Sequence, residues 1–253
     1  ESTKSTVKEN IIDNKINIEF NVEDAERIVI KKINILGNNI TKENVIRNRL
    51  EIDEGDLYNE ILALKSINNL RALNFFKTVD LKVDDIDTGF KVMNITVDEK
   101  PTGEIMAGAG FGTGGSTLAA GVKENNYLGK GISLDTTLSL GEDSIKGKFS
   151  IENPNYNNSD KSIYSSIQAI ETNKLSDFGY KSNKTGVSVG TAFEFFDDLN
   201  LGLGVDAFYE KIETDSTASS RQKNQAGDYF DTFINMSFNY DKRDQRFQTT
   251  EGF

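Results

Sequence analysis

The sequence predicts an α+β domain followed by an antiparallel transmembrane β-barrel. Apolar residues recur at helical spacing only before about residue 100, within a β-α-α-β-β order of elements. After residue 102, apolar and polar residues alternate in about eight successive segments. Many of these segments approach the roughly 9 to 11 residues that a strand needs to cross a bilayer, whereas strands in soluble sheets usually have about 5 or 6.

Composition excludes several classes of function. The 253 residues include no cysteine and no histidine, which rules out disulfides, Cys/His zinc sites, a Ser-His-Asp triad and a thiol nucleophile. A formal net charge of -11 argues against nucleic-acid binding, which depends on clustered Lys and Arg. No stretch reaches the roughly 20 apolar residues of a membrane helix. A mean hydropathy of -0.48 is compatible with barrel strands, because these are apolar only at alternate positions.

Residues 1–25 contain one predicted strand, in which apolar residues alternate from Ile16 to Val22. A similar pattern recurs at 92–99, which indicates a repeated module. We therefore expect residues 1–25 to be the C-terminal end of a preceding copy and residues 26–100 to form a complete one.

Residues 26–100 contain alternating strand and helix signals. Predicted strand 27–36 is followed by helix 41–50, with Thr41 as its cap. Predicted helix 59–73 places one apolar stripe against a sheet. The stripe consists of Ile61, Leu64, Ile67 and Leu70. Strands 77–83 and 90–97 complete a domain in which two helices cover one face of a three-stranded sheet.

Residues 101–253 favour a barrel because the two faces of each predicted strand differ. One face is apolar, and the other is small or polar, as a water-filled lumen permits. The small or polar face includes Ser133, Asp135, Ser139, Lys146, Lys148, Ser166, Gln168, Gly202 and Gly204. Aromatic residues near strand ends predict a girdle at the membrane interfaces. They are Tyr127, Tyr156, Phe195, Phe196, Tyr209, Tyr229, Phe230 and Tyr240. A soluble β-sandwich, whose strands also alternate, is the alternative.

An ordered set of motifs resembles the BamA family of outer-membrane β-barrel assembly factors. Within 26–100, Gly37-Asn38, Gly55-Asp56-Leu57-Tyr58 and Leu73-Asn74-Phe75-Phe76 are similar to the last POTRA domain of that family. Three further motifs resemble its barrel turns. They are Asn126-Tyr127-Leu128-Gly129-Lys130-Gly131, Asn153-Pro154-Asn155-Tyr156, and Tyr240-Asp241-Lys242-Arg243-Asp244 with Thr249-Thr250-Glu251-Gly252. The family more often has a proline at the position of Thr249.

The resemblance implies that residues 26–100 are the last POTRA domain and that residues 101–253 are the N-terminal half of the barrel, about the first eight of sixteen strands. It places the barrel in the outer membrane of a Gram-negative bacterium and the POTRA domain in the periplasm. Expected partners are unfolded outer-membrane proteins, accessory lipoproteins of the assembly complex and outer-membrane lipid. No enzyme activity, cofactor or metal is expected.

This topology assigns the loops to the two sides of the membrane. Loops at 112–116, 141–144, 172–183 and 213–228 are expected to face outside, and turns at 124–130 and 196–200 to face the periplasm. The same superfamily includes two-partner secretion pores and translocation-and-assembly proteins, so protein translocation is an alternative function. A soluble β-rich adhesin is a third.

Glycines are frequent near the first barrel strand. Gly110, Gly112 and Gly115 match G-x-G-x-x-G, but a phosphate-binding loop of that kind needs a following helix, and 116–123 is predicted as a strand. Glycine weakens a strand, so its use here predicts either close packing on the lumen side of a tight hairpin or a deliberately weak strand. In the family the first strand closes against the last, and that seam opens laterally. The resemblance therefore implies that an incoming strand pairs here with Glu104, Ile105, Met106, Ala107, Gly108, Ala109, Gly110 and Phe111.

By the same resemblance, one strand of the POTRA sheet lies at its edge and pairs with a nascent chain or an accessory lipoprotein. It consists of Lys77, Thr78, Val79, Asp80, Leu81, Lys82 and Val83. The charged residues Asp241, Arg243 and Asp244 are interpreted as an ion-paired turn, in preference to a metal or acid-base cluster.

Overall fold

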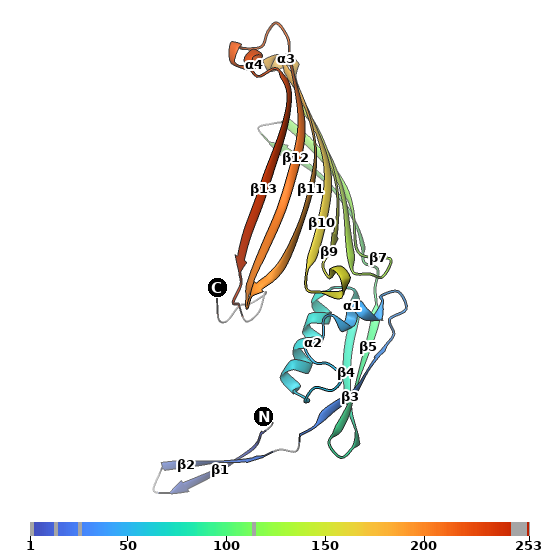
Figure 1. The fold of residues 1–253 in the computed structure, drawn as a ribbon, viewed down its shortest axis with the longest axis vertical. Helices are drawn as coiled ribbons and strands as arrows, with labels where there is room; N and C mark the ends of the chain where they lie inside the picture. Colours follow the sequence, from blue (N-terminus) through green and yellow to red (C-terminus); the bar gives the residue numbers. More distant parts are fainter. Residues whose placement is uncertain (1–2, 13–14, 25–26, 113–114, 244–251, 253) are drawn as a thin grey trace. The chain divides into compact units, whose positions relative to one another are not determined.

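The computed structural model describes residues 3–12, 15–24, 27–112, 115–243 and 252 (Figure 1). The chain divides into two compact units, Glu1–Lys100 and Pro101–Phe253. None of the helices within the described ranges has the length and apolarity that a membrane-spanning helix requires.

The first unit begins with a hairpin of β1 (Thr3–Ile12) and β2 (Lys15–Asp24), which pair antiparallel along their whole length. The prediction of a single strand here was wrong. Most residues of β1 are polar, so its sequence lacks the apolar alternation that identified β2. Whether this hairpin ends a preceding module stays a prediction.

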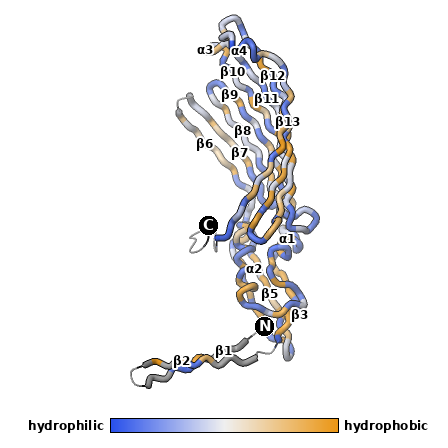
Figure 2. The backbone as a smooth tube through the Cα atoms, turned by 60° about the vertical axis from the view of Figure 1, so that its left-hand side comes forward, coloured by the Kyte–Doolittle hydropathy of each residue, from blue (hydrophilic) through white to orange (hydrophobic). Residues whose placement is uncertain are grey.

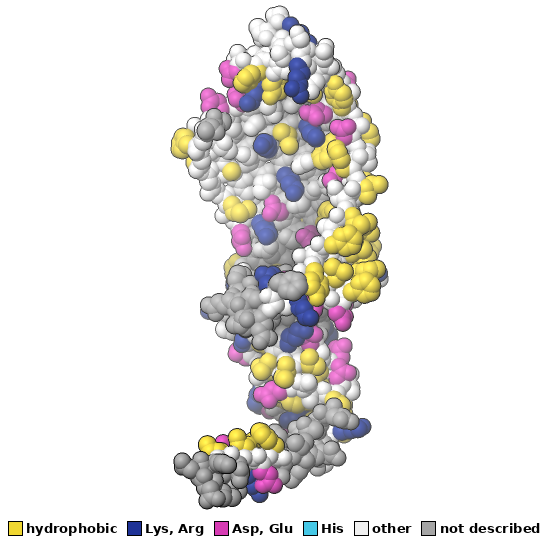
Figure 3. All heavy atoms as spheres, turned by 90° about the vertical axis from the view of Figure 1, so that its left-hand side faces the viewer, with side chains coloured by type: hydrophobic (Ala, Val, Ile, Leu, Met, Phe, Trp, Pro, Cys, Tyr) yellow, Lys and Arg dark blue, Asp and Glu magenta, His cyan; other side chains and the backbone are white. Residues whose placement is uncertain are grey.

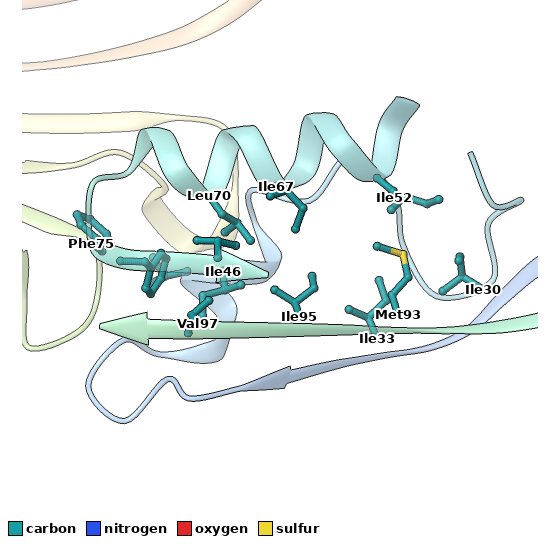
Figure 4. Packing of buried hydrophobic residues seen from close by; sticks show 14 residues of the cluster. Ile30, Ile33, Ile46, Ile52, Ile67, Leu70, Phe75, Met93, Ile95 and Val97 are labelled. Atoms are coloured by element: carbon teal, nitrogen blue, oxygen red, sulfur yellow. The ribbon is translucent and has the colours of Figure 1, made fainter. Parts of the chain in front are cut away.

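The remainder of the first unit has the predicted β-α-α-β-β order. Its elements are β3 (Val29–Leu36), α1 (Glu43–Arg47), α2 (Glu60–Ala72), β4 (Phe76–Asp87) and β5 (Phe90–Glu99). The three-stranded sheet has the order β3-β5-β4, with β3 parallel to β5 and β4 antiparallel to it. Helix α2 lies over this sheet and encloses an apolar core between them (Figure 4).

Two details of the helices differ from the prediction. Residue Thr41 is not the cap of α1, because the helix begins after Lys42, which forms no side-chain cap. Of the predicted stripe on α2, Ile67 and Leu70 are buried, but Ile61 is 75% exposed and Leu64 is 54% exposed. The buried face is completed by the small residues Ala63 and Ser66.

Ser66 explains the error on α2. Its hydroxyl donates to the carbonyl of Leu62 (2.8 Å) and accepts from the backbone N–H of Glu51 (2.8 Å). A hydroxyl with both partners present is buried at little cost. A search for apolar residues alone therefore misses this position.

The second unit is an open eight-stranded antiparallel sheet in which each strand pairs with the next along the chain. The strands are β6 (Gly103–Gly112), β7 (Gly115–Tyr127), β8 (Ile132–Gly141), β9 (Ser144–Asn153), β10 (Ser162–Lys174), β11 (Tyr180–Phe196), β12 (Leu199–Thr214) and β13 (Gly227–Tyr240). Short helices η1 (Tyr156–Asn158), α3 (Leu175–Phe178) and α4 (Ser220–Asn224) lie in the connections.

One predicted loop differs from the structure because the two strands beside it extend further than expected. The predicted loop at 172–183 is wrong, because β10 and β11 pair as far as Lys174 and Tyr180 and leave only 175–179 between them. The ion pair between Lys181 and Glu171 (2.7 Å) lies within this extended pairing. Polar residues that pair across strands resemble a loop in the sequence. Residues 113–114, Asp244, Thr249, Thr250 and Glu251 lie outside the described residues.

Strand register confirms the two predicted faces. All nine predicted small or polar residues share one face, which we call the polar face. One cross-strand row on it consists of Lys123, Asp135, Ser150, Ser166, Ser188 and Asp206. The adjacent row on the opposite, apolar face consists of Val122, Thr136, Phe149, Ile167, Val187 and Ala207. Hydrophobic and hydrophilic segments alternate along these strands in Figure 2.

The apolar face ends at a sharp boundary on β10–β13. Tyr209 pairs with Phe230 at its limit, and the next residue on this face of each strand is charged or an amide. That row, the boundary row, consists of Glu171, Asn183, Lys211 and Asp228. The predicted aromatic girdle is wrong for Tyr229, which alternates onto the polar face and donates to the carbonyl of Gln225 (2.9 Å).

Candidate strand-pairing edges

Strand β6 forms one end of the eight-stranded sheet. It contains all eight residues of the predicted gate strand, and among the described strands it pairs only with β7. Ile105 pairs with Val122 on the apolar face, and both Ile105 (86% exposed) and Phe111 (88% exposed) are almost uncovered. The second long edge of β6 is therefore free of pairing within the described chain.

The glycines of β6 are not explained by crowding. A β-carbon built on Gly108, Gly110 or Gly112 would have no atom within 4 Å, and none of the three has a positive φ. Within the described chain, close packing on the lumen side therefore does not account for these residues. Each glycine weakens the strand by about 0.5 to 1 kcal/mol relative to alanine, without a steric need for it. The prediction that 116–123 is a strand is confirmed by β7.

Strand β4 forms one end of the three-stranded sheet and contains the predicted segment from Lys77 to Val83. The residues of this segment alternate: Val79 is 2% exposed and lies in the core, whereas Asp80 and Lys82 lie on the exposed face. One side-chain bond occupies the outer part of β4, where Arg71 donates from Nη2 to the carbonyl of Val79 (3.0 Å).

The opposite end of the same sheet, at β3, is covered by the chain itself. The N–H of Ile30 donates to the carbonyl of Asp56 (2.9 Å), and its carbonyl accepts from the N–H of Gly55 (2.8 Å). At Ile33, the N–H donates to Glu54 Oε1 (2.9 Å) and the carbonyl accepts from Arg47 Nη2 (3.1 Å). Pattern analysis missed this arrangement, because the covering groups come from separate loops and helices.

A carboxylate at the end of β5 fixes the loop that precedes α1. Oxygen Oε2 of Glu99 accepts from the N–H groups of Asn39 and Ile40 (both 2.8 Å), and Oε1 accepts from that of Thr41 (2.6 Å). Partial burial acts to raise the pKa of Glu99, but the hydrogen bonds from Thr41, Ile40 and Asn39 outweigh it and hold the pKa below its ordinary value.

The charged turn after β13 is an ion pair in the structure. Arg243 contacts Asp241 through two nitrogens, at 2.6 Å each. Within the described ranges, no group of three or more acidic side chains is placed to hold a metal ion.

Comparison with known families gives two matches along the chain. The POTRA family, described as a surface antigen variable number repeat, matches residues 28–100. The Omp85 superfamily domain matches residues 126–253. The chain belongs to the Omp85 superfamily. These two matches, together with relatives whose names refer to the outer membrane, place the protein in the outer membrane of a bacterium, with its POTRA domain in the periplasm.

Two curated relatives of this chain carry the same name. It is 26% identical to an outer membrane protein assembly factor BamA of Neorickettsia risticii, covering 94% of this chain and 33% of that protein. It is 24% identical to the protein of the same name from Nitratidesulfovibrio vulgaris, covering 99% of this chain and 31% of that protein. The chain thus spans about a third of the length of these curated relatives.

The crystal structure of BamA from Haemophilus ducreyi lacking POTRA domains 1-3 has the same fold, with a TM-score of 0.75 at 22% identity. The match covers 99% of this chain and 52% of that one. The eight-stranded sheet therefore has the fold of part of an Omp85 barrel.

Proposed function

We propose that the protein folds and inserts β-barrel proteins into the outer membrane, with capture at β4 and a lateral gate at β6. The observation that supports this most directly is the pair of open strand edges, in a chain whose relatives are named as outer-membrane protein assembly factors. The substrates are unfolded outer-membrane proteins.

Capture at β4 follows from the difference between the ends of the POTRA sheet. Ile30 and Ile33 of β3 have backbone partners already, so an added strand would have to displace them. An extended chain can instead add to β4, where it has the side-chain bond from Arg71 to the carbonyl of Val79 to displace, with backbone hydrogen bonds that contribute about 0.5 to 1.5 kcal/mol each. Accessory lipoproteins of the assembly complex can use the same mode.

Insertion at β6 follows from its two faces. An incoming strand of a barrel protein alternates in the same way, so it can place apolar side chains beside Ile105 and Phe111 and polar ones beside Glu104. Burial of the apolar side chains in lipid, together with strand pairing, supplies the driving force. No bond is made or broken in the substrate, and neither a cofactor nor a metal takes part.

Depletion of the full-length protein in its native cell tests the assembly function. Several unrelated outer-membrane barrels should fall in amount and in insertion rate together. Normal levels of all of them would contradict the proposal. If only one exported protein is affected, the translocation-pore alternative is favoured. Recovery of the protein in the aqueous fraction after membrane washing would favour the soluble adhesin.

Cross-linking tests the gate. These 253 residues contain no cysteine, so a cysteine introduced at Ala107 is the only one in this part of the protein. In stalled assembly it should form disulfides with cysteines in the edge strand of the substrate. Cysteine at Thr232 on β13 is the matched control on the same face. Equal cross-linking at both positions would exclude a specific role for β6.

A further inference from the structure

The polar face of β10–β12 contains an aromatic side chain that lies over two glycines. Tyr164 pairs directly with Gly190 on β11, and Gly190 pairs directly with Gly204 on β12. A β-carbon at either glycine would lie closer than 3.0 Å to the phenol of Tyr164. The ring therefore spans three strands in a space that exists only because two residues lack a side chain.

A second aromatic residue, on β12, packs over a glycine of β11 in the same way. Phe208 on β12 pairs directly with Gly186 on β11, and a β-carbon there would overlap the phenyl ring. Lys184 Nζ lies 4.6 Å from the centre of the Phe208 ring, and the Phe233 ring on β13 lies 6.0 Å away. Aromatic contacts thus connect β10 to β13 on a face where the sequence predicted only small and polar residues.

Register follows from this packing. If β10 slipped by two residues along β11, Tyr164 would face Ser188 or Ala192 in place of Gly190. Both residues have a β-carbon in the space that the ring occupies. Aromatic side chains over glycines are a known means of fixing strand register, and here they fix three successive strands.

The other half of the sheet lacks such contacts at its glycines. On the same polar face, Gly108, Gly110 and Gly112 of β6 have nothing within 4 Å of a built β-carbon. A β-carbon on Gly121 of β7 would lie 3.1 Å from the backbone oxygen of Thr136, 3.2 Å from the end of the Met106 side chain and 3.3 Å from the Thr137 methyl group, so no aromatic ring covers it. These glycines lower strand stability without a compensating contact from an aromatic ring.

We propose that Tyr164 and Phe208 fix the register of β10–β12, to which the Phe208–Phe233 contact joins β13. These four strands form a rigid panel, and the opening movement is confined to β6–β9. The proposal rests on the lateral gate proposed above, because it assigns the limit of that movement. Tyr164 is a positioning residue, because its proposed role is to hold β10, β11 and β12 in register while β6–β9 move.

The packing of Tyr164 over Gly204 can be tested by adding a methyl group at Gly204 and removing the hydroxyl group of Tyr164. A β-carbon at Gly204 is crowded only by the Tyr164 hydroxyl, and the next atom of the ring is 3.6 Å away. Gly204→Ala should therefore lower the thermal unfolding temperature of the full-length protein in detergent and speed amide exchange in β10–β12. The double variant with Tyr164→Phe, which lacks the hydroxyl, should restore both.

Two controls make the result specific. Gly108→Ala adds the same methyl group where nothing lies within 4 Å, so it should not lower the unfolding temperature. Gly190→Ala should not be rescued by Tyr164→Phe, because its β-carbon would also lie 2.6 Å from the carbonyl oxygen of Leu203. The proposed packing is wrong if Gly204→Ala lowers the unfolding temperature no more than Gly108→Ala does. It is also wrong if Tyr164→Phe fails to restore the unfolding temperature of the Gly204→Ala variant.

The confinement of movement has a separate measurement. Strands β7 and β8 are paired on both sides, as are β11 and β12, so edge effects do not bias their comparison. In the full-length protein, amide exchange in β11–β12 should be about tenfold slower than in β7–β8. Tyr164→Ala should remove most of that difference without changing β7–β8. Equal amide exchange in β7–β8 and β11–β12 of the wild-type protein would contradict the rigid panel, even if the depletion experiment supports the assembly function. If depletion leaves the outer-membrane barrels at normal levels, the gate proposal fails, but the stability comparison of the Gly204 and Tyr164 variants still stands.

Discussion

The POTRA unit and the eight-stranded sheet place their apolar residues in opposite positions. In the first unit, residues such as Ile30, Met93 and Ile95 are 0% exposed and belong to one buried apolar cluster. In the second, Ile167 and Val187 remain about half exposed, at 54% and 48%. Figure 3 shows Lys, Arg, Asp and Glu side chains interspersed over one face of this sheet, with hydrophobic ones gathered along one side. The first unit thus builds its own apolar interior, whereas the second requires lipid to supply one.

The largest expected effect is in the POTRA core. Ile95→Ala should lower the free energy of unfolding of this unit by about 2 to 5 kcal/mol, because a buried side chain is replaced by a cavity. Amide exchange of β3–β5 in the intact protein measures it. Ile61→Ala, at a residue 75% exposed, is the matched control and should change it by less than about 0.5 kcal/mol. Equal effects would mean that this core is wrongly assigned.

A charge on the apolar face should have a comparable but slightly smaller effect. Val205→Arg faces lipid and should destabilise the folded barrel by about 2 to 4 kcal/mol. Ser188→Arg on the polar face faces water and should cost much less. Refolding of the full-length protein into lipid vesicles, followed by gel mobility with and without heating, measures both. Similar losses for the two variants would contradict the assignment of the faces.

The Glu99 carboxylate should make the POTRA unit sensitive to acid. Its pKa is lower in the folded state, so its contribution is fully present above its ordinary pKa near 4.5 and is lost as pH falls through the folded value. Amide exchange of Asn39, Ile40 and Thr41 should therefore speed up relative to the rest of the unit in that range. Glu99→Gln should remove this dependence and cost about 1 kcal/mol at neutral pH. An unchanged profile in the variant would show that another group is responsible.

The smallest expected effect lies in β6. Gly108→Ala should stabilise this strand by about 0.5 to 1 kcal/mol and slow substrate insertion, because the proposed gate then opens less readily. Faster or unchanged insertion, with confirmed slower amide exchange in β6, would separate strand weakness from function.

The sequence predicted features that repeat within one element and missed those that depend on a partner. Alternation fixed which face of each strand is polar, because side chains on a strand have a period of two. Tyr164 has no such signal, since its space is created by Gly190 and Gly204 on other strands. Likewise, the loop at Thr41 is held by Glu99, a residue 58 positions away.

The predicted pairing strands show the same limit. Strand β6 was located by its alternating residues and its glycines, and the pairing role of both β6 and β4 came from resemblance to a family. That the opposite end at β3 is closed depends on Glu54 and Arg47, which reach Ile33 from a loop and a helix. Only the folded chain brings these three residues together.

The boundary row on β10–β13 also has a kinetic consequence. To leave the bilayer towards the periplasm, these strands would have to draw Lys211 and its neighbour Lys181 through the hydrocarbon, at about 2 to 4 kcal/mol for each lysine at the midplane. Entry carries the same barrier but is followed by strand pairing and burial of the apolar face. The row therefore makes extraction slower than insertion. Once the charged residues are across, this part of the sheet is retained in the membrane for much longer than it took to insert.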